Sequence, residues 1–281
     1  MQFTTYQEIF DLIEALGGVD SFTTDEQAKI LALVNRRLYQ AYRSSEFWPR
    51  YIVSAQARPA TEGLVPWEYD HVAGIRGITA ATRSGTTVTL TLASDTDVVA
   101  GMTVTVAGLT GSEDPNGNYK VKTVEDNTVT YDLEAGTGTE TYGGSGTMSP
   151  VAIPAIDSFI RIWAFSPFSN NRYYDFDYYV EVDGARVVDS KALDGYWVAF
   201  KKRWDGPYTT AATTIPAEFR EYAAHAAYAD FLRMDSQVDK AMAEEAVAQQ
   251  YLVLELDKVE HGRNVNTTGK RITTYVSRSN R

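Results

Sequence analysis

The spacing of apolar residues divides the chain into helical and extended parts. Apolar residues recur at helical spacing over four segments, 5–17, 23–45, 216–234 and 237–261. A period near 3.6 predicts amphipathic helices, whereas a period of two predicts half-buried strands. Aromatic and β-branched residues between about 159 and 204 predict strands there. The pattern therefore predicts helices towards both ends of the chain and β-structure between them.

Local signals place the ends of these helices. Thr-x-x-Glu boxes at 5–8 and 23–26 can cap the first turns of the two N-terminal helices, because the Thr and Glu side chains satisfy free backbone N–H groups. Asp235 and Ser236 interrupt the apolar spacing between the last two helices. Gly262 is typical of a helix end. We therefore expect the last helix to stop there, with an extended segment beyond it.

Residues 77–148 differ in composition from the rest of the chain. They contain 17 Thr and 11 of the chain's 20 Gly, but none of its 5 Trp and none of its 11 Phe. Apolar and polar residues alternate at 87–92, and Asn-Gly at 116–117 is a turn signal. We therefore predict that 77–148 is an inserted small β domain, barrel-like or immunoglobulin-like, and that 1–76 and 149–281 together form the other domain.

Charge is distributed unevenly over a chain whose formal net charge is −11. The segment 263–281 has no acid and carries +5, from Arg263, Lys270, Arg271, Arg278 and Arg281. Residues 1–262 therefore carry −16 (−11 minus +5). An acidic body argues against general affinity for nucleic acid, since phosphate binding depends on Lys and Arg. A basic, polar tail is typical of a segment that binds a partner. The alternative is a frayed, solvated terminus.

Residue types that catalyse reactions or bind metals occur in no recognisable arrangement. The chain has no Cys, and its three His residues, His71, His225 and His261, lack metal-site spacing. Motifs of zinc proteases, α/β-hydrolases and P-loop proteins are absent. No apolar run approaches the roughly 18 residues of a membrane span. We therefore predict a protein that is not an enzyme and has no cofactor, no metal and no membrane partner.

Three segments outside the β module carry a resemblance to a known family. They are Glu-Phe-Trp-Pro-Arg at 46–50, Ile-Pro-Ala-Glu-Phe at 215–219, and Leu-Arg-Met-Asp-Ser-Gln-Val-Asp-Lys-Ala at 232–241. In this order they resemble the head–tail connector (adaptor) proteins of tailed bacteriophages. Those proteins commonly have an Ile-Pro pair and a Leu-Arg-x-Asp-x-Gln-x-Asp-Lys-Ala junction in a C-terminal helix pair. The resemblance covers roughly 1–76 and 149–281.

The inserted module is similar to a small β unit that recurs in phage structural proteins. The similarity lies in the segments 85–91, 100–108 and 116–119. The His-Gly pair that commonly precedes the second of these is replaced here by Ser-Asp-Thr-Asp at 94–97. Most connectors lack such an insertion. The family resemblance therefore implies no role for the module.

The connector resemblance implies a fold, an assembly and a set of partners. The fold class is α+β, with a helical connector core, an antiparallel β middle and the inserted all-β module. Connector subunits form a ring, commonly of twelve, that joins the portal protein to the next tail or neck protein. Double-stranded DNA passes through the ring without being bound specifically. Such a protein is made in the bacterial host cytoplasm and ends in the neck of the virion.

The resemblance also implies two groups of site residues. The tail that would dock on the portal contains Arg263, Lys270, Arg271, Tyr275, Arg278 and Arg281. Small and apolar residues of the C-terminal helix pair would pack helices closely within the ring: Ala223, Ala226, Ala227, Leu252 and Leu256. A basic tail suits an acidic or polar groove on a portal.

Two other classes of function stay open. One is another tail or baseplate structural protein whose β module binds a neighbour or a host glycan, for which Tyr119, Tyr131 and Tyr142 are the available aromatic residues. The other is an enzyme such as a cell-wall glycosidase. That enzyme would need two carboxylates in a cleft, one with a raised pKa, and the sequence shows no such pair. The connector is the hypothesis that the residues favour.

Overall fold

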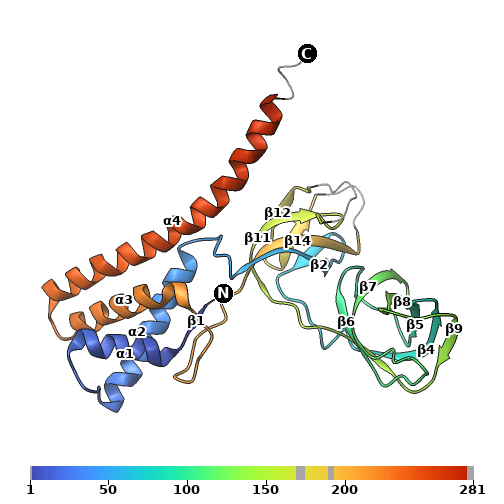
Figure 1. The fold of residues 1–281 in the computed structure, drawn as a ribbon, viewed down its shortest axis with the longest axis horizontal. Coiled ribbons are helices and arrows are strands. Elements are labelled where there is room, and N and C mark those ends of the chain that lie inside the picture. The colour runs from blue at the N-terminus through green and yellow to red at the C-terminus, as the bar shows by residue number, and fades with distance from the viewer. Residues whose placement is uncertain (1, 169–174, 189–192, 277–281) are drawn as a thin grey trace. The chain divides into compact units, whose positions relative to one another are not determined.

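The computed structural model describes residues 2–168, 175–188 and 193–276, without the side chains of 262–276 (Figure 1). The chain divides into two compact units. The first is Met1–Tyr51 together with Trp204–Arg281, and the second is Ile52–Arg203. The second unit is thus a continuous segment inserted into the first.

The first unit is mainly helical. Its described residues form four α-helices, one turn of 3-10 helix and a two-stranded ribbon: α1 (Tyr6–Gly17), α2 (Thr24–Arg43), η1 (Ala217–Phe219), α3 (Arg220–Met234), α4 (Val238–Val276), β1 (Phe3–Thr4) and β15 (Ile215–Pro216). Helix α3 contacts α1, α2 and α4. It is therefore the central element of the unit.

Both N-terminal helices begin with capping boxes. The backbone N–H of Glu8 donates to Thr5 Oγ1 (3.1 Å), and the N–H of Thr5 donates back to Glu8 Oε2 (3.1 Å). Thr23 and Glu26 form the same pair at the start of α2. Helix α1 ends at Gly18, whose φ of 64° is left-handed and favours glycine. These local bonds satisfy helix-end N–H groups that would otherwise need water.

The last helix is longer than the sequence predicts. The turn between α3 and α4 lies at Asp235 and Ser236, and Ser236 adopts a left-handed φ of 62°. Helix α4 then continues as far as Val276, where the sequence predicts an end at Gly262 and an extended segment beyond it. A single Gly costs a helix only about 1 kcal/mol relative to Ala, and no Pro follows to end it. Gly262 is therefore a weak stop.

Alanine lets helices approach α3 closely. Five alanines of α3 are fully or almost fully buried: Ala223, Ala224, Ala226, Ala227 and Ala229. Larger side chains of the surrounding helices, such as Ile13 of α1, Leu38 of α2 and Leu252 of α4, are buried in the same core. Helix α3 therefore has core on several sides, and the surrounding helices supply most of the apolar volume.

A buried arginine joins three of the helices. Arg37 of α2 donates from Nε and Nη2 to the two carboxylate oxygens of Asp230 on α3, at 2.6 Å each. Its Nη1 and Nη2 also donate to Glu245 of α4, at 3.0 and 2.8 Å. Arg233 contacts both carboxylates as well. We call these four residues the Arg37 network.

Burial and pairing act in opposite directions on the two carboxylates of this network. Burial raises the pKa of Asp230, but hydrogen bonds and attraction from Arg37 outweigh it, so the pKa lies below its ordinary value. Glu245 behaves in the same way, with Gln249, Arg37 and Arg233 as its partners. Both carboxylates are therefore more acidic in the folded protein than in the unfolded chain.

The second unit is built only from strands among its described residues. They are β2 (Ile52–Pro59), β3 (Leu64–Pro66), β4 (Arg76–Ser84), β5 (Thr87–Leu92), β6 (Thr103–Ala107), β7 (Gly117–Glu125), β8 (Thr128–Asp132), β9 (Thr139–Tyr142), β10 (Thr147–Pro150), β11 (Ile156–Trp163), β12 (Tyr178–Val180), β13 (Gly184–Val187) and β14 (Gly195–Lys202). Neighbouring strands pair as antiparallel ladders in three sheets.

Six of these strands close into a barrel. The order is β10-β6-β7-β8-β5-β4, and β4 pairs with β10 through Thr147↔Gly77 and Met148↔Arg76, which completes the circle. Strand β9 adds to the outer edge of β4. Along β5 the residues Val88, Leu90 and Leu92 are buried while the threonines between them are not, as a period of two requires. Closure leaves the six strands without a free edge.

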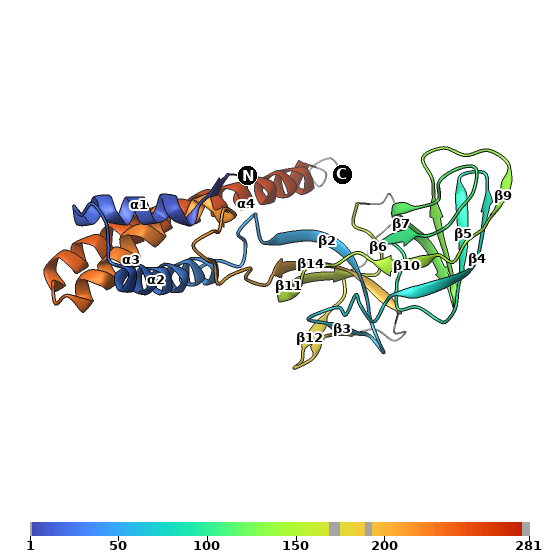
Figure 2. The same cartoon turned by 90° about the horizontal axis from the view of Figure 1, so that it is seen from below.

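Two three-stranded sheets complete the second unit (Figure 2). One has the order β11-β14-β2 and the other β12-β13-β3. They share a core that includes Phe159, Ile162, Tyr196, Val198 and Phe200. The barrel has a separate core, against which Trp197 of β14 packs.

The predicted fold class, an α+β fold with a helical connector core, is wrong. The described chain has fifteen strands, including a closed six-stranded antiparallel barrel, and only four α-helices. One source of the error is 52–66, which lies in the predicted connector domain 1–76, where no strand was predicted, but forms β2 and β3. Their pairing with β14 and β13, over a hundred residues away in sequence, is not visible in a local pattern.

Removing Arg37 should destabilise the protein severely, because Asp230 and Glu245 would lose their buried cationic partner and keep only the more exposed Arg233. We expect Arg37→Ala to lower the free energy of unfolding by about 3–5 kcal/mol. The neighbouring Arg36→Ala is the control, since Arg36 is exposed and should cost less than about 0.5 kcal/mol. Urea unfolding measures both. Equal losses in the two variants would show that the network does not hold the helices.

The Arg37 network should also make stability depend on pH. Because the folded pKa values of Asp230 and Glu245 are lowered, their stabilisation is present above the unfolded values of about 3.9 and 4.3 and is lost as pH falls through the folded values. We expect the unfolding free energy to fall from pH 5 towards pH 3, more steeply than in Arg37→Met, in urea titrations. If the unfolding free energies of the wild type and of Arg37→Met fall in parallel with pH, the Arg37 network is not the source of the pH dependence.

Candidate functional site

The five residues predicted to pack helices closely, within or between subunits, lie inside the core of the helical unit. Ala223, Ala226 and Ala227 are buried in the contacts of α3 with the surrounding helices. Leu252 is buried and Leu256 is partly buried on the face of α4 that covers α3. Small residues at helical spacing predict close packing but not which helix is the neighbour. These five therefore offer little surface to a second copy.

The residues of the predicted docking tail lie outside the described side chains. The backbone of 263–276 belongs to α4, so that Arg263, Lys270, Arg271 and Tyr275 are at helical positions. Arg278 and Arg281 lie outside the described residues altogether. The basic segment is thus, up to Val276, a continuation of the longest helix.

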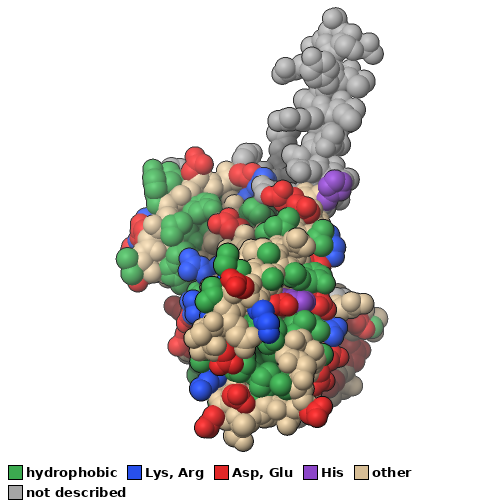
Figure 3. Space-filling view, turned by 90° about the vertical axis from the view of Figure 1, so that its left-hand side faces the viewer, with side chains coloured by type: hydrophobic (Ala, Val, Ile, Leu, Met, Phe, Trp, Pro, Cys, Tyr) green, Lys and Arg blue, Asp and Glu red, His purple; other side chains and the backbone are tan. Residues whose placement is uncertain are grey.

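Helix α4 exposes apolar residues between positions 238 and 254. They are Val238, Met242, Val253 and Leu254, each more than half exposed. Figure 3 shows hydrophobic side chains reaching the surface between charged ones on one face of the molecule. A helix that is apolar around most of its circumference is typical of one that is covered on several sides. The sequence pattern already carries this signal, because 251–254 is a run of four apolar residues.

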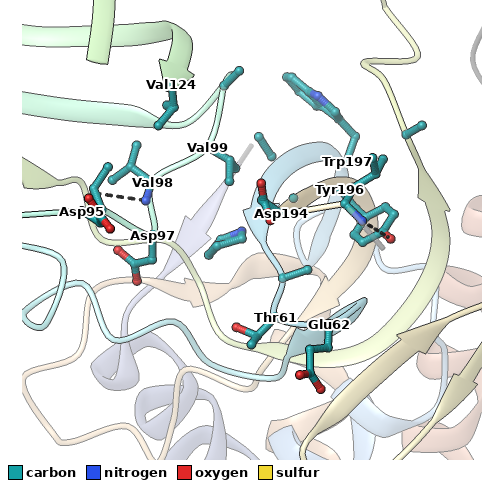
Figure 4. Close-up of a pocket in the computed structure, with 18 of the residues that line it drawn as sticks. Thr61, Glu62, Asp95, Asp97, Val98, Val99, Val124, Asp194, Tyr196 and Trp197 are labelled. Carbon is teal, nitrogen blue, oxygen red and sulfur yellow. Dashed lines mark hydrogen bonds between the residues drawn. The ribbon is translucent and has the colours of Figure 1, made fainter. Parts of the chain in front are cut away.

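A pocket with a volume of about 670 Å³ lies in the second unit (Figure 4). Three segments line it: the turn after β2 with Thr61 and Glu62, the loop before β6 with 95–100, and the start of β14 with 194–197. Val124 of β7 and Phe165 complete the wall. The sequence pattern gives no sign of this pocket, because its segments are brought together only by the pairing of distant strands.

Five carboxylates line this pocket, and no Lys or Arg is among its described lining residues: Glu62, Asp95, Asp97, Asp126 and Asp194. Asp97 accepts a hydrogen bond from the hydroxyl of Tyr69 (3.0 Å). Burial, followed by the charge of Asp97, raises the pKa of Tyr69. We call this the acidic pocket. Its negative potential repels phosphate groups.

The wall of the acidic pocket contains an indole ring held between close neighbours. Trp197 lies against Gly101, where a Cβ atom would meet the ring and also approach the Cβ of Ala57. The ammonium group of Lys120 lies 5.1 Å from the centre of the same ring. Gly101 has a left-handed φ of 93°. Both its backbone and the contact with the ring therefore require glycine.

The described residues contain no arrangement that would hold a metal ion. No group of three or more His, Cys, Asp and Glu side chains converges in the parts of the chain that the structure describes. A hard cation needs several oxygen ligands at one point. Of the carboxylates of the acidic pocket, only Asp95 and Asp97 share a loop, and the others come from different segments (Figure 4). Over the same residues, no helix is both long enough and apolar enough to cross a bilayer.

Comparisons with known proteins identify no relative of this chain. No family model, no curated protein and no solved structure matches it. The resemblance to phage connectors stays a prediction from three sequence segments. Any inference about function therefore depends on the residues and geometry of this chain.

Replacing Gly101 should disturb Trp197. We expect Gly101→Ala to lower stability by about 1–3 kcal/mol more than Gly85→Ala, because overpacking adds to the cost of a left-handed alanine. Gly85 is the matched control, with a φ of 63° and no atom within 4 Å of the position that a Cβ would take. Thermal unfolding gives the difference, and tryptophan fluorescence reports the ring. Equal losses of stability in the two variants would mean that the Trp197 ring moves aside without an energetic cost.

Proposed function

We propose that this protein is a non-enzymatic virion structural protein of a tailed bacteriophage. In this role its copies form a ring that joins the portal to the next tail or neck protein. Double-stranded DNA passes through the ring without specific binding. The single observation that carries the proposal is the segment 232–241, which resembles the connector junction and forms the turn between α3 and α4.

The junction segment is tied into the rest of the helical unit. Leu232 is buried in the core, and Arg233 donates to Asp230 (2.8 Å) and Glu245 (3.2 Å) of the Arg37 network. The backbone N–H of Gln237 donates to the carbonyl of Leu232 (2.9 Å) and closes the turn. The residues that carry the resemblance thus have a structural role at this turn, which supports a shared local fold.

Charge supports the proposed partners. The segment 263–281 carries +5, which suits an acidic or polar groove on a portal, and the rest of the chain carries −16. An acidic body repels DNA, so DNA can slide past it without sticking. The apolar residues exposed on α4 suit a protein that works in an assembly.

The alternative is another tail or baseplate protein whose β module binds a neighbour or a host glycan. Glycan binding usually relies on exposed aromatic faces. In the barrel, Tyr131 and Tyr142 are buried, and Tyr119 stacks on Tyr131 with ring centres 4.3 Å apart. These contacts leave little aromatic surface for a sugar. Binding of a neighbouring protein is therefore the stronger form of this alternative.

Deleting 263–281 should abolish binding to portal rings while the fold survives, because this segment carries the cations that would face the portal. The measurement is co-sedimentation of the truncated and full-length proteins with portal rings from the same virus, with circular dichroism to follow folding. A matched control keeps the length and replaces the five cations of the segment by Gln. We expect that variant to lose binding as well.

Two results would contradict docking through the charges of the tail. If the truncated protein binds the portal as well as the full chain does, the segment is not the docking element. If the Gln variant binds normally but the truncation does not, the helix itself docks and its charge is unimportant. A full-length protein that ignores the portal would contradict the connector role as a whole.

A further inference from the structure

Charge separates into two blocks near the N-terminus, with acids in α1 and in the first turn of α2 (Asp25 and Glu26) and cations along the rest of α2. Residues 1–28 contain six acids and no Lys or Arg, whereas 29–45 contain four Lys or Arg and no acid. Arg37 is used in the buried network, which leaves Lys29, Arg36 and Arg43. These three are exposed. Beyond its first turn, α2 therefore exposes only cations among its charged side chains, in a protein of net charge −11.

The cations of α2 lie on one face of the helix. Lys29, Arg36 and Arg43 are seven residues apart, which places them on one side at intervals of about 10 Å. Ala32 and Tyr39 lie between them at the spacing of a heptad seam. We call these five residues the basic face. No carboxylate lies within 4.0 Å of its three cations in the described structure.

The basic face also offers an aromatic contact. Tyr39 is 44% exposed, and the guanidinium of Arg43 lies 5.9 Å from the centre of its ring. Tyr and Arg are enriched at the centres of protein interfaces, where both apolar area and hydrogen bonds are needed. This combination suits a protein partner better than a phosphate backbone, which would meet only the charges.

Helix α1 presents the complementary surface. Asp11 is exposed and accepts a hydrogen bond from the side chain of Gln7 (2.7 Å), Glu14 is half-buried, and Ala15 is exposed. Glu8, the third acid of α1, is already engaged with Thr4 and Thr5. We call Asp11, Glu14 and Ala15 the acidic face. Asp11 to Ala15 spans roughly 6 Å along α1, so the acidic face covers only part of the roughly 21 Å from Lys29 to Arg43.

The two faces do not neutralise each other within one chain. Helix α3 contacts both α1 and α2, whereas α1 and α2 scarcely contact each other (Figure 2). No ion pair joins Asp11 or Glu14 to the basic face in the described structure. Each face is thus free to meet a charged partner outside the chain.

We propose that the basic face of one copy binds the acidic face of α1 on the next copy. The contact joins two different surfaces, so it is heterologous, and repetition of such a contact produces a ring when the rotation closes. This inference rests on the proposed function, because it names the subunit contact of the proposed ring. The charge complementarity of the two faces selects a second copy as the partner.

Charge reversal tests the contact. Arg36→Glu with Arg43→Glu, and separately Asp11→Lys with Glu14→Lys, should each weaken self-association by about tenfold or more, because like charges then face each other. A chain with all four changes should regain association. Lys120→Glu with Lys240→Glu is the control for the α2 variant, with the same change in charge at two exposed positions elsewhere. Sedimentation equilibrium gives the constants, and circular dichroism checks folding.

Cross-linking provides a second measurement that does not change the charges. The chain has no cysteine, so Ala15→Cys in one preparation and Ala32→Cys in another give two unique thiols. Under mild oxidation the mixture should form the mixed dimer faster than either preparation forms its own dimer. Ala15→Cys mixed with Lys240→Cys is the control and should form no excess of mixed dimer.

The outcomes separate this contact from the connector role. Unchanged self-association after either reversal, or no recovery in the fourfold variant, would overturn the contact. A wild-type chain that stays monomeric at all concentrations would also overturn it. So would a charge reversal on α2 that abolishes binding to double-stranded DNA and leaves self-association intact. Copies that associate through these faces but ignore portal rings would leave the contact standing and contradict the connector role.

Discussion

The guanidinium group of Arg37 determines whether three helices can share one core. The Arg37 side chain is 9% exposed, and its guanidinium faces two carboxylates from two other helices. The carboxylates compensate its charge only while all three groups keep this geometry. A buried ion pair of this kind adds little net stability compared with apolar residues, but it makes other arrangements costly. The turn between α3 and α4 must bring Asp230 and Glu245 to the same point. The network thus fixes how the C-terminal helix pair lies on α2.

The β unit can be inserted into this helical unit because its two ends emerge close together. Tyr51 precedes the insertion and Trp204 follows it, and their rings lie 6.2 Å apart in one aromatic cluster with Tyr42. The helical core therefore closes without the 52–203 segment. The barrel in turn closes on itself through the pairing of β4 with β10. Each unit has its own core, which is how one chain can combine them.

Features set by neighbouring residues could be predicted from the sequence, whereas features set by contacts between distant residues could not. Capping boxes at Thr5 and Thr23, and the turn at Asp235, are short-range features that a sequence displays directly. The predicted fold class is wrong because β2 and β3 depend on partners more than a hundred residues away. The Arg37 network has the same character, since its partners are 193 and 208 residues distant. The acidic pocket, formed by three distant segments, could not be found in the sequence for the same reason.

The most direct test of the connector role is electron microscopy of the purified protein, alone and mixed with portal rings from the same virus. The proposal predicts a ring of copies on one end of the portal, with density for the inserted barrel on each subunit. Particles that remain monomeric and leave the portal bare would contradict it. In that case the exposed residues of α4 and the barrel would point to a different assembly of the tail.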